Sequence, residues 1–195
     1  MAEEKKGLQA VSAAQPVELW EKQLSSETIY DGKIFRIAKD KVELPNGHTS
    51  TREVAHHCDG VGVLPLTEDG KVLCVKQYRY CFGRVMLEIP AGKMDIGGET
   101  PLETAVRELQ EETGCIADEM ISLGGMAGSP GCMTETVWLY LAKGLHQGQQ
   151  NPDDDEFLNV EAIDLDVLTD MADRGEIIDG KTLAAIYKVR RILGK

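Results

Sequence analysis

A chain of 195 residues is long enough to build one well-packed domain with a small appendage. Its formal net charge of -12 argues against nucleic acid and against an anionic membrane surface as partners. The sequence has no apolar run of about 18 residues, and its first residues lack the apolar segment of a signal peptide, so we expect a cytoplasmic protein.

The first part of the chain is predicted to form a tail and a small β unit. Residues 1–17 are polar and alanine-rich, which is typical of a mobile tail. Within residues 18–57, strand-like segments alternate with turn sequences; the segments are residues 27–30, 33–44 and 49–57. An antiparallel unit of this size buries too little surface to be stable alone, so we expect it to pack on the next domain or on a second subunit. We therefore expect a homodimer, with this unit serving dimerisation or substrate binding.

Residues 58–195 are predicted to form the main domain. Two apolar segments, residues 61–66 and 71–75, flank a turn and predict a hairpin at the centre of a mixed sheet. Further strands are expected at residues 120–126, 136–142 and 157–163, and helices at residues 166–174 and 182–193. This order is typical of an α/β domain in which helices cover a central sheet.

A further helix is predicted to begin near Pro101. Thr100 has the properties of a capping residue, Pro101 suits the first helical position, and Glu103 supplies a carboxylate three residues after the cap. Gly114 is placed to end the helix in a left-handed turn. The apolar residues at three- and four-residue steps predict the face that packs on the core; they are Leu102, Ala105, Val106 and Leu109.

Three carboxylates share one face of this helix. Glu108, Glu111 and Glu112 stand at positions i, i+3 and i+4, where like charges repel by about 0.2 to 0.5 kcal/mol per pair. A bound divalent cation would reverse that cost. A solvated acidic face is the alternative interpretation of such a cluster.

The segment from Gly92 to Cys115 resembles the Nudix box, written G-x5-E-x7-R-E-U-x-E-E-x-G-U with U a bulky apolar residue. The matching residues are Glu99, Arg107, Glu108, Leu109, Glu111, Glu112, Gly114 and Cys115. Two departures stand out: six residues instead of five separate Gly92 from Glu99, and Cys115 is smaller than the usual last residue. Because the extra residue lies in the glycine-containing turn at residues 95–98, we expect the carboxylate face to be preserved.

Over residues 20–195 the sequence is similar to the ADP-ribose pyrophosphatase branch of the Nudix superfamily. The segments that carry this similarity are residues 52–54, 75–80 and 87–93, and Ser129-Pro130-Gly131 followed by Glu135. A proline about fifteen residues past the box, here Pro130, is the mark by which that branch is told from Nudix enzymes that act on nucleoside triphosphates.

The resemblance implies a Nudix α/β/α sandwich with a mixed central sheet, in addition to the small N-terminal antiparallel β unit. It also implies that the three helix carboxylates hold divalent cations, with the backbone carbonyl of Ala91 completing the site. Mg²⁺ suits this all-oxygen ligand set, and Mn²⁺ is expected to substitute. Glu99 and Arg107 are interpreted as an ion pair that orients the ligands.

Glu135 is the candidate for activating water. In the enzymes that this chain resembles, the loop after the box supplies a carboxylate that positions or deprotonates the attacking water, and Glu135 follows Ser129-Pro130-Gly131 in that loop. An exposed glutamate without a catalytic role is the alternative, and Glu111 or Glu112 could be the base instead.

Two arginines are candidates for substrate binding. Arg52 and Arg79 could bind a phosphate or the terminal ribose, because a guanidinium offers a bidentate fork; as strand residues, they could instead pair with glutamates on the surface. Glu88 could orient Arg79 or a ribose hydroxyl. His56 and His57 are adjacent, so on a strand they point to opposite faces, and a structural role is favoured.

The function implied by the resemblance is metal-dependent hydrolysis of the pyrophosphate bond of ADP-ribose to AMP and ribose 5-phosphate. Such chemistry needs metals, an activated water and positioned phosphates, without a covalent intermediate. One alternative is the same chemistry on another nucleoside diphosphate sugar or on a dinucleotide. The other is a catalytically idle Nudix domain that senses ADP-ribose.

Overall fold

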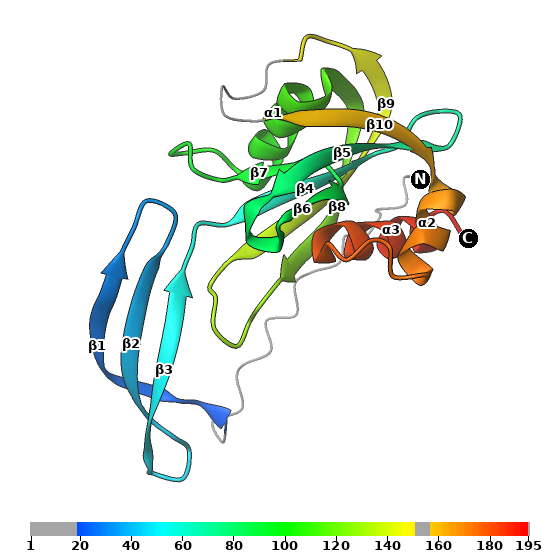
Figure 1. Ribbon diagram of the computed structural model, residues 1–195. Coiled ribbons are helices and arrows are strands. Elements are labelled where there is room, and N and C mark those ends of the chain that lie inside the picture. Colours follow the sequence, from blue (N-terminus) through cyan, green and yellow to red (C-terminus); the bar gives the residue numbers. More distant parts are fainter. Residues whose placement is uncertain (1–18, 151–156, 195) are drawn as a thin grey trace, which may run out of the picture. The chain divides into compact units, whose positions relative to one another are not determined.

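The computed structural model describes residues 19–150 and 157–194 (Figure 1). The tail predicted at residues 1–17 lies outside them. Contacts divide the chain into two units, of which the first ends at Ala55 and the second begins at His56. The boundary predicted from the sequence falls after His57. None of the helices in the described ranges is long and apolar enough to cross a membrane.

The first unit is a three-stranded sheet. Its strands, in the order β1-β2-β3, are β1 (Lys22–Asp31), β2 (Arg36–Glu43) and β3 (Thr49–His56), and β1 pairs with β2 antiparallel. Gly47 closes the second turn with a φ of 81° and donates its N–H to the Leu44 carbonyl at 2.8 Å. Every residue of β1 is exposed, and the buried apolar residues of this sheet are Ala38 and Val42. The sheet therefore has little core of its own.

The second unit contains two sheets. The larger is mixed, with the order β7 (Ala91–Lys93), β4 (Gly60–Pro65), β9 (Thr136–Gln147) and β8 (Cys115–Ala127). Its one parallel pairing joins β4 to β9. The smaller sheet is antiparallel, with the order β10 (Leu158–Asp164), β5 (Lys71–Arg79) and β6 (Arg84–Glu88), and the short 3₁₀ helix η2 (Tyr80–Phe82) lies between β5 and β6.

The predicted hairpin at residues 61–75 is wrong. The turn is present, but a single bridge between Leu66 and Val72 joins its two sides, and β4 and β5 enter different sheets. The reason is that both edges of β4 are already paired, one with β7 and the other with β9. β4 is buried at every position, as expected for a central strand.

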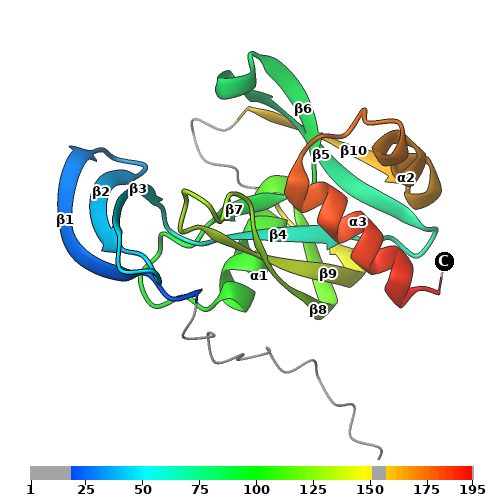
Figure 2. The same ribbon diagram turned by 90° about the horizontal axis from the view of Figure 1, so that it is seen from below.

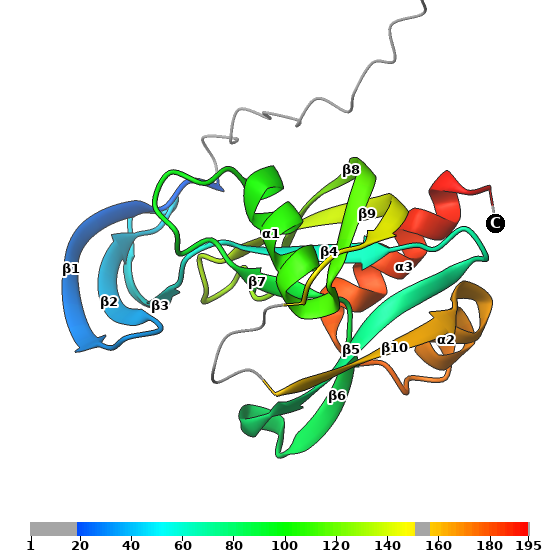
Figure 3. The same cartoon turned by 90° about the horizontal axis from the view of Figure 1, so that it is seen from above.

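Helices cover both faces of the larger sheet, which confirms the predicted α/β/α sandwich. Seen from below and from above, α3 (Gly180–Ile192) and α1 (Pro101–Thr113) lie on opposite sides of it (Figures 2 and 3). α2 (Leu165–Asp173) packs beside α3. Neighbouring residues of β4 serve the two cores: Val63 packs with Ala105 and Leu109 on the α1 side, whereas Leu64 packs on the α3 side.

The ends of α1 are where the sequence predicts them. The Thr100 hydroxyl accepts the Glu103 N–H at 3.3 Å, and the Glu103 carboxylate accepts the Thr100 N–H at 2.8 Å, which forms a capping box. Gly114 ends the helix with a φ of 70°, and its N–H is bound by the Gln110 carbonyl at 2.8 Å. A side-chain cap at one end and a glycine in the left-handed conformation at the other therefore mark the two boundaries.

The predicted buried face of α1 is only partly right. Ala105 and Leu109 are buried, but Leu102 is 44% exposed and Val106 is 42% exposed. The remaining buried positions of the helix are polar or charged: Thr104, Glu108, Glu112 and Thr113. The helix has turned its carboxylates toward the domain, and two apolar residues face outward as a consequence.

Candidate functional site

The carboxylate cluster lies against β7. Glu108 is 7% exposed and Glu112 is 2% exposed, although each is an acid on a helix surface. The Ala91 N–H donates to Glu112 Oε2 at 3.2 Å, so the carboxylate reaches the backbone of the strand that precedes the box. Burial of this kind is costly for an acid unless polar or charged partners compensate it.

Gly92 makes room for one of these carboxylates. A Cβ atom at Gly92 would lie 1.9 Å from Glu108 Cδ and 2.0 and 2.3 Å from its two oxygens. Real side chains do not approach so closely, so the absence of a side chain at this position lets Glu108 contact β7. The first glycine of the box therefore has a steric function.

Arg107 joins the carboxylates. Its Nη1 atom donates to Glu108 Oε1 at 2.7 Å and to Glu111 Oε2 at 2.8 Å, and its Nε lies 3.3 Å from Glu99 Oε1. Partial burial lowers the pKa of Arg107, but the charges of Glu108 and Glu111 outweigh this effect and raise it overall. The predicted contact between Glu99 and Arg107 is present. The longer turn at residues 95–98, in which Gly98 has a φ of 94°, leaves it in place.

These residues fit a divalent cation. Oxygens of Glu108 and Glu111 converge on a single positively charged nitrogen of Arg107, which shows that one small cationic group can contact both. Carboxylates and backbone carbonyls are the ligands that Mg²⁺ prefers. Within residues 19–150 and 157–194, no three His, Cys, Asp or Glu side chains are already arranged as a metal cluster, and Glu108 and Glu111 are instead bound to Arg107.

A second charged cluster surrounds Glu88, which is 1% exposed. Arg79 donates to both of its oxygens, each at 2.7 Å, and Lys181 also contacts it. Burial would raise the pKa of Glu88, but the hydrogen bonds and charges of Arg79 and Lys181 outweigh it and lower the pKa to about 2. Glu88 thus holds the Arg79 guanidinium in one orientation, as the sequence suggested.

Sequence reasoning missed Lys181 and Asp179. Lys181 Nζ lies 3.0 Å from Asp179 Oδ1, and Asp179 caps α3 by accepting the Thr182 N–H at 3.0 Å. The cap could have been found, since an aspartate three residues before Thr182 is a typical helix start. The contact with Glu88 could not, because 93 residues separate Lys181 from it.

Glu135 lies beside β7, the strand that contains Gly92. One of its oxygens and the Gly92 carbonyl oxygen are both within 4 Å of the place that a Cβ of Gly60 would take. The side chain is 25% exposed, and its Oε1 lies 3.3 Å from His57 Nδ1. The loop carboxylate and the start of the box are therefore neighbours, and the partner His57 was assigned only a structural role from the sequence.

Arg52 belongs to the first unit. Its Nε donates to Glu21 Oε2 at 2.9 Å, with a second bond from Nη2 to Glu21 Oε1. This is the surface pairing with a glutamate that the sequence left open. A part in substrate binding remains a prediction for Arg52.

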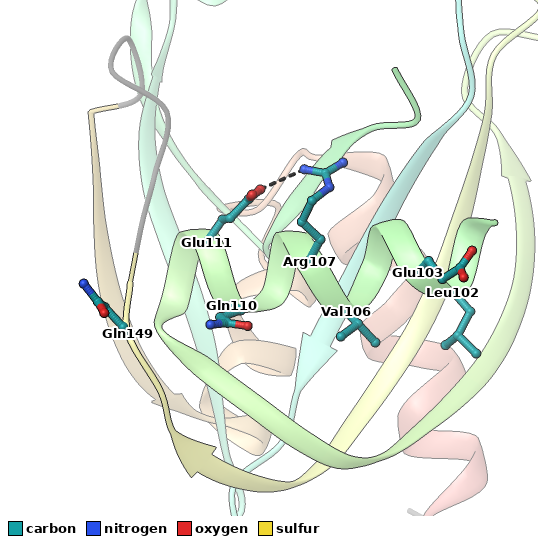
Figure 4. A pocket seen from close by; sticks show the side chains of 7 residues that line it. All are labelled: Leu102, Glu103, Val106, Arg107, Gln110, Glu111 and Gln149. Atoms are coloured by element: carbon teal, nitrogen blue, oxygen red, sulfur yellow. Dashed lines mark hydrogen bonds and ion pairs between the residues drawn. The ribbon is translucent and has the colours of Figure 1, made fainter. Parts of the chain in front are cut away.

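A shallow pocket lies on the outer side of α1. Figure 4 shows Leu102, Val106 and Gln110 along this side of the helix, with the ion pair between Arg107 and Glu111 at its edge. The pocket explains where the two misassigned apolar residues point. It shares Arg107 and Glu111 with the carboxylate cluster.

Three features are typical of a Nudix fold: the α/β/α sandwich, the capped helix α1, and the carboxylates of α1 that pack on β7 at Gly92. A family model described as the NUDIX domain matches residues 56–186. A second, described as the nucleoside diphosphate sugar hydrolase N-terminal domain, matches residues 21–55. The chain belongs to the Nudix family.

Several known proteins are similar to this chain. An ADP-ribose pyrophosphatase of Bacillus subtilis is 39% identical over 170 residues, covering 86% of this chain and 91% of that protein. A methanol dehydrogenase activator of Bacillus methanolicus is 40% identical over 168 residues, covering 85% and 90%. The crystal structure of an ADP compounds hydrolase has a TM-score of 0.80 at 22% identity and covers 90% of this chain and 96% of that one, which shows the shared fold.

Proposed function

We propose that this Nudix protein hydrolyses the pyrophosphate bond of ADP-ribose to AMP and ribose 5-phosphate. The observation that carries the proposal is the convergence of Glu108 and Glu111 oxygens on one cationic nitrogen, beside the strand that Gly92 keeps open. The names of relatives from Bacillus subtilis and Mycobacterium tuberculosis, both ADP-ribose pyrophosphatases, support the choice of substrate. The cytoplasmic location expected from the sequence remains a prediction.

The metal site is assigned to α1 and β7. Glu108, Glu111 and Glu112 would hold the cation together with the Ala91 carbonyl, and Mg²⁺ suits these oxygen donors, with Mn²⁺ as a substitute. The chemistry that a bound divalent cation supplies is neutralisation of the pyrophosphate charge and a lower pKa for water. Arg107, held by Glu99, keeps the carboxylates of the helix in a fixed arrangement.

The remaining roles fall to residues around the cluster. Glu135 accepts the proton of the attacking water, because it is the partly exposed carboxylate beside Gly92 that is not committed to Arg107. Glu111 and Glu112 are the other candidates for this base. Arg79, oriented by Glu88, presents its guanidinium to a phosphate or to the terminal ribose. Arg52 is a further substrate-binding candidate.

A second candidate substrate is another nucleoside diphosphate sugar or a dinucleotide. It is favoured by the family model at residues 21–55, which is named for nucleoside diphosphate sugar hydrolases. Relatives named GDP-mannose pyrophosphatase, 33% identical over 143 residues in one case, also support it. The metal site and the base would be unchanged, and only the groups that recognise the base and sugar would differ.

The first unit supports a homodimer. Several large apolar side chains of this unit are exposed: Trp20 at 62%, Leu24 at 43%, Ile29 at 56% and Tyr30 at 56%. A three-stranded sheet with so little core gains stability when another surface covers it. Light scattering coupled to size exclusion should give twice the mass of the chain, and Ile29→Lys should reduce that mass; a monomeric wild type would contradict this assignment.

The test of substrate is a comparison at equal concentrations of enzyme. ADP-ribose, ADP-glucose, GDP-mannose, NADH and a diadenosine polyphosphate are incubated with Mg²⁺, and AMP and phosphate-containing products are separated by ion exchange. Turnover highest on ADP-ribose, with AMP and ribose 5-phosphate as products, supports the proposal. Higher turnover on another substrate favours the second candidate, and binding of ADP-ribose without turnover favours an idle sensor.

A further inference from the structure

The loop that carries Glu135 is fixed at both sides of this residue. On one side, the Thr134 hydroxyl accepts the His57 N–H at 3.1 Å and donates to the His57 carbonyl at 3.3 Å. On the other side, the Thr136 N–H donates to Asp59 Oδ1 at 3.0 Å. The segment that leads into β4 therefore binds the side chain of the residue just before Glu135 and the backbone of the residue just after it.

Asp59 also ties this anchor to the box. Its second oxygen, Oδ2, accepts the indole N–H of Trp138 at 3.2 Å, and its carbonyl accepts the Met94 N–H at 2.9 Å. One residue thus contacts both the start of β9 and the residue that follows β7. Asp59 therefore links the loop around Glu135 to β7. These contacts do not set the side-chain torsion angles of Glu135.

His57 contacts the carboxylate itself. Its Nδ1 lies 2.6 Å from the Cys58 carbonyl oxygen and 3.3 Å from Glu135 Oε1. A carbonyl oxygen can only accept a hydrogen bond, so Nδ1 carries a proton and donates it. That bond fixes the ring with Nδ1 next to Glu135 Oε1, and the side chain, which is 12% exposed, has little freedom to turn away.

We propose that His57 is a positioning residue that holds the Glu135 carboxylate toward the start of the Nudix box. This inference rests on the proposed function, in which Glu135 is the base. A glutamate has three rotatable side-chain bonds, and the contact of a fixed polar nitrogen with one oxygen favours the rotamers that keep the carboxylate beside Gly92. Loss of orientation of a catalytic group lowers the rate without changing how well the substrate binds.

The test measures kcat and KM for ADP-ribose with Mg²⁺ in a set of variants. His57→Ala removes the donor, and we expect kcat to fall by about 10- to 100-fold while KM stays within about 2-fold. His57→Asn places an amide nitrogen near the position of Nδ1 and should recover much of the rate, whereas His57→Gln places its amide near Nε2 and should not. Thermal denaturation of each variant reports folding separately.

A double variant distinguishes positioning from a general structural effect. If His57 acts through Glu135, adding His57→Ala to Glu135→Gln should cost almost nothing beyond Glu135→Gln alone. His146→Ala is the matched control, because it breaks another histidine–carboxylate contact, His146 Nε2 to Asp118 Oδ2 at 2.9 Å, between the exposed side chains of β8 and β9. Its kcat should equal that of the wild type.

Several results would overturn the assignment. These are a kcat of His57→Ala within about 2-fold of the wild type, equal rates for the Asn and Gln variants, or additive losses in the double variant. If His57→Ala does not fold, the comparison of the Asn and Gln variants decides the question. A wild type without turnover would instead overturn the proposed function, and the role of His57 with it. An active wild type, together with an unchanged kcat in His57→Ala, would overturn only the role of His57.

Discussion

The steric role of Gly92 gives the sharpest prediction about the metal site. In Gly92→Ala the new Cβ would stand 1.9 Å from Glu108 Cδ, whereas ordinary contact begins at 3.4 Å. The carboxylate must therefore retreat by the difference, about 1.5 Å. The end of a glutamate side chain can move that far without unfolding the domain, but it then leaves β7. We expect a folded protein with a displaced metal ligand.

The expected loss follows from this displacement. A misplacement of about 1 Å in a catalytic arrangement can cost roughly 100-fold in rate, and a disturbed metal site lowers cation affinity as well. We therefore expect kcat/KM for ADP-ribose to fall by about 100-fold or more, and the Mg²⁺ concentration for half-maximal rate to rise. Steady-state hydrolysis over a Mg²⁺ titration measures both.

Gly97→Ala is the matched control. Gly97 lies in the turn that follows β7, its φ is not positive, and a Cβ there would meet nothing within 4 Å. The two variants make the same chemical change, so backbone stiffening alone cannot separate them. Equal activity of Gly92→Ala and Gly97→Ala, with both folded, would refute the argument that Gly92 exists to admit the Glu108 carboxylate.

Three further predictions concern stability and reactivity. The folded protein lowers the pKa of Glu88 from 4.5 to about 2, so this carboxylate contributes stability above pH 4.5 that is lost as the pH falls to 2, roughly 3 kcal/mol in all. In urea denaturation at several pH values, the free energy of unfolding of the wild type should fall over this range, and that of Glu88→Gln should lack this fall. The same pH dependence in both proteins would contradict the prediction. Leu109→Ala should lower the free energy of unfolding by about 2 to 5 kcal/mol in the same assay, and Leu102→Ala by no more than about 0.5 kcal/mol, because Leu109 is 1% exposed and Leu102 is 44% exposed. Similar losses in the two variants would contradict the orientation of α1. Burial raises the pKa of the Cys74 thiol to about 12, so a maleimide should label exposed Cys81 and leave Cys74 unmodified in the folded protein, as mass spectrometry of peptides would show.

The sequence predicts features that depend on residues close together in the chain better than features that depend on residues far apart in it. The bounds of α1 depend on Thr100, Glu103 and Gly114, which act within a few residues of themselves, and the sequence predicts them correctly. The buried face of the same helix is different. Apolar spacing placed Leu102 and Val106 in the core, but the helix buries Glu108 and Glu112 against β7, a strand outside the helix. There Gly92 leaves space for the Glu108 carboxylate, and the Ala91 N–H donates to Glu112.

Strand partners and charge partners show the same limit. The turn at residues 67–70 predicts that β4 and β5 pair. Instead, β4 pairs on one edge with β7 and on the other with β9, and both strands follow much later in the chain. Lys181 reaches Glu88 only because α3 packs across the sheet. No pattern within a short window encodes such contacts, whereas the spacing of the box indicated which carboxylates gather.

The most direct measurement of the central claim is hydrolysis of ADP-ribose by the wild type and by Glu112→Gln, each with Mg²⁺ and with a chelator. Gln keeps the size of this buried side chain and removes its charge, so folding is preserved while a metal ligand is lost. We predict AMP and ribose 5-phosphate from the wild type with Mg²⁺, and a rate lower by about 100-fold or more in the variant and with chelator. Equal rates in the wild type and the folded variant would contradict the assignment of this helix as the catalytic metal site.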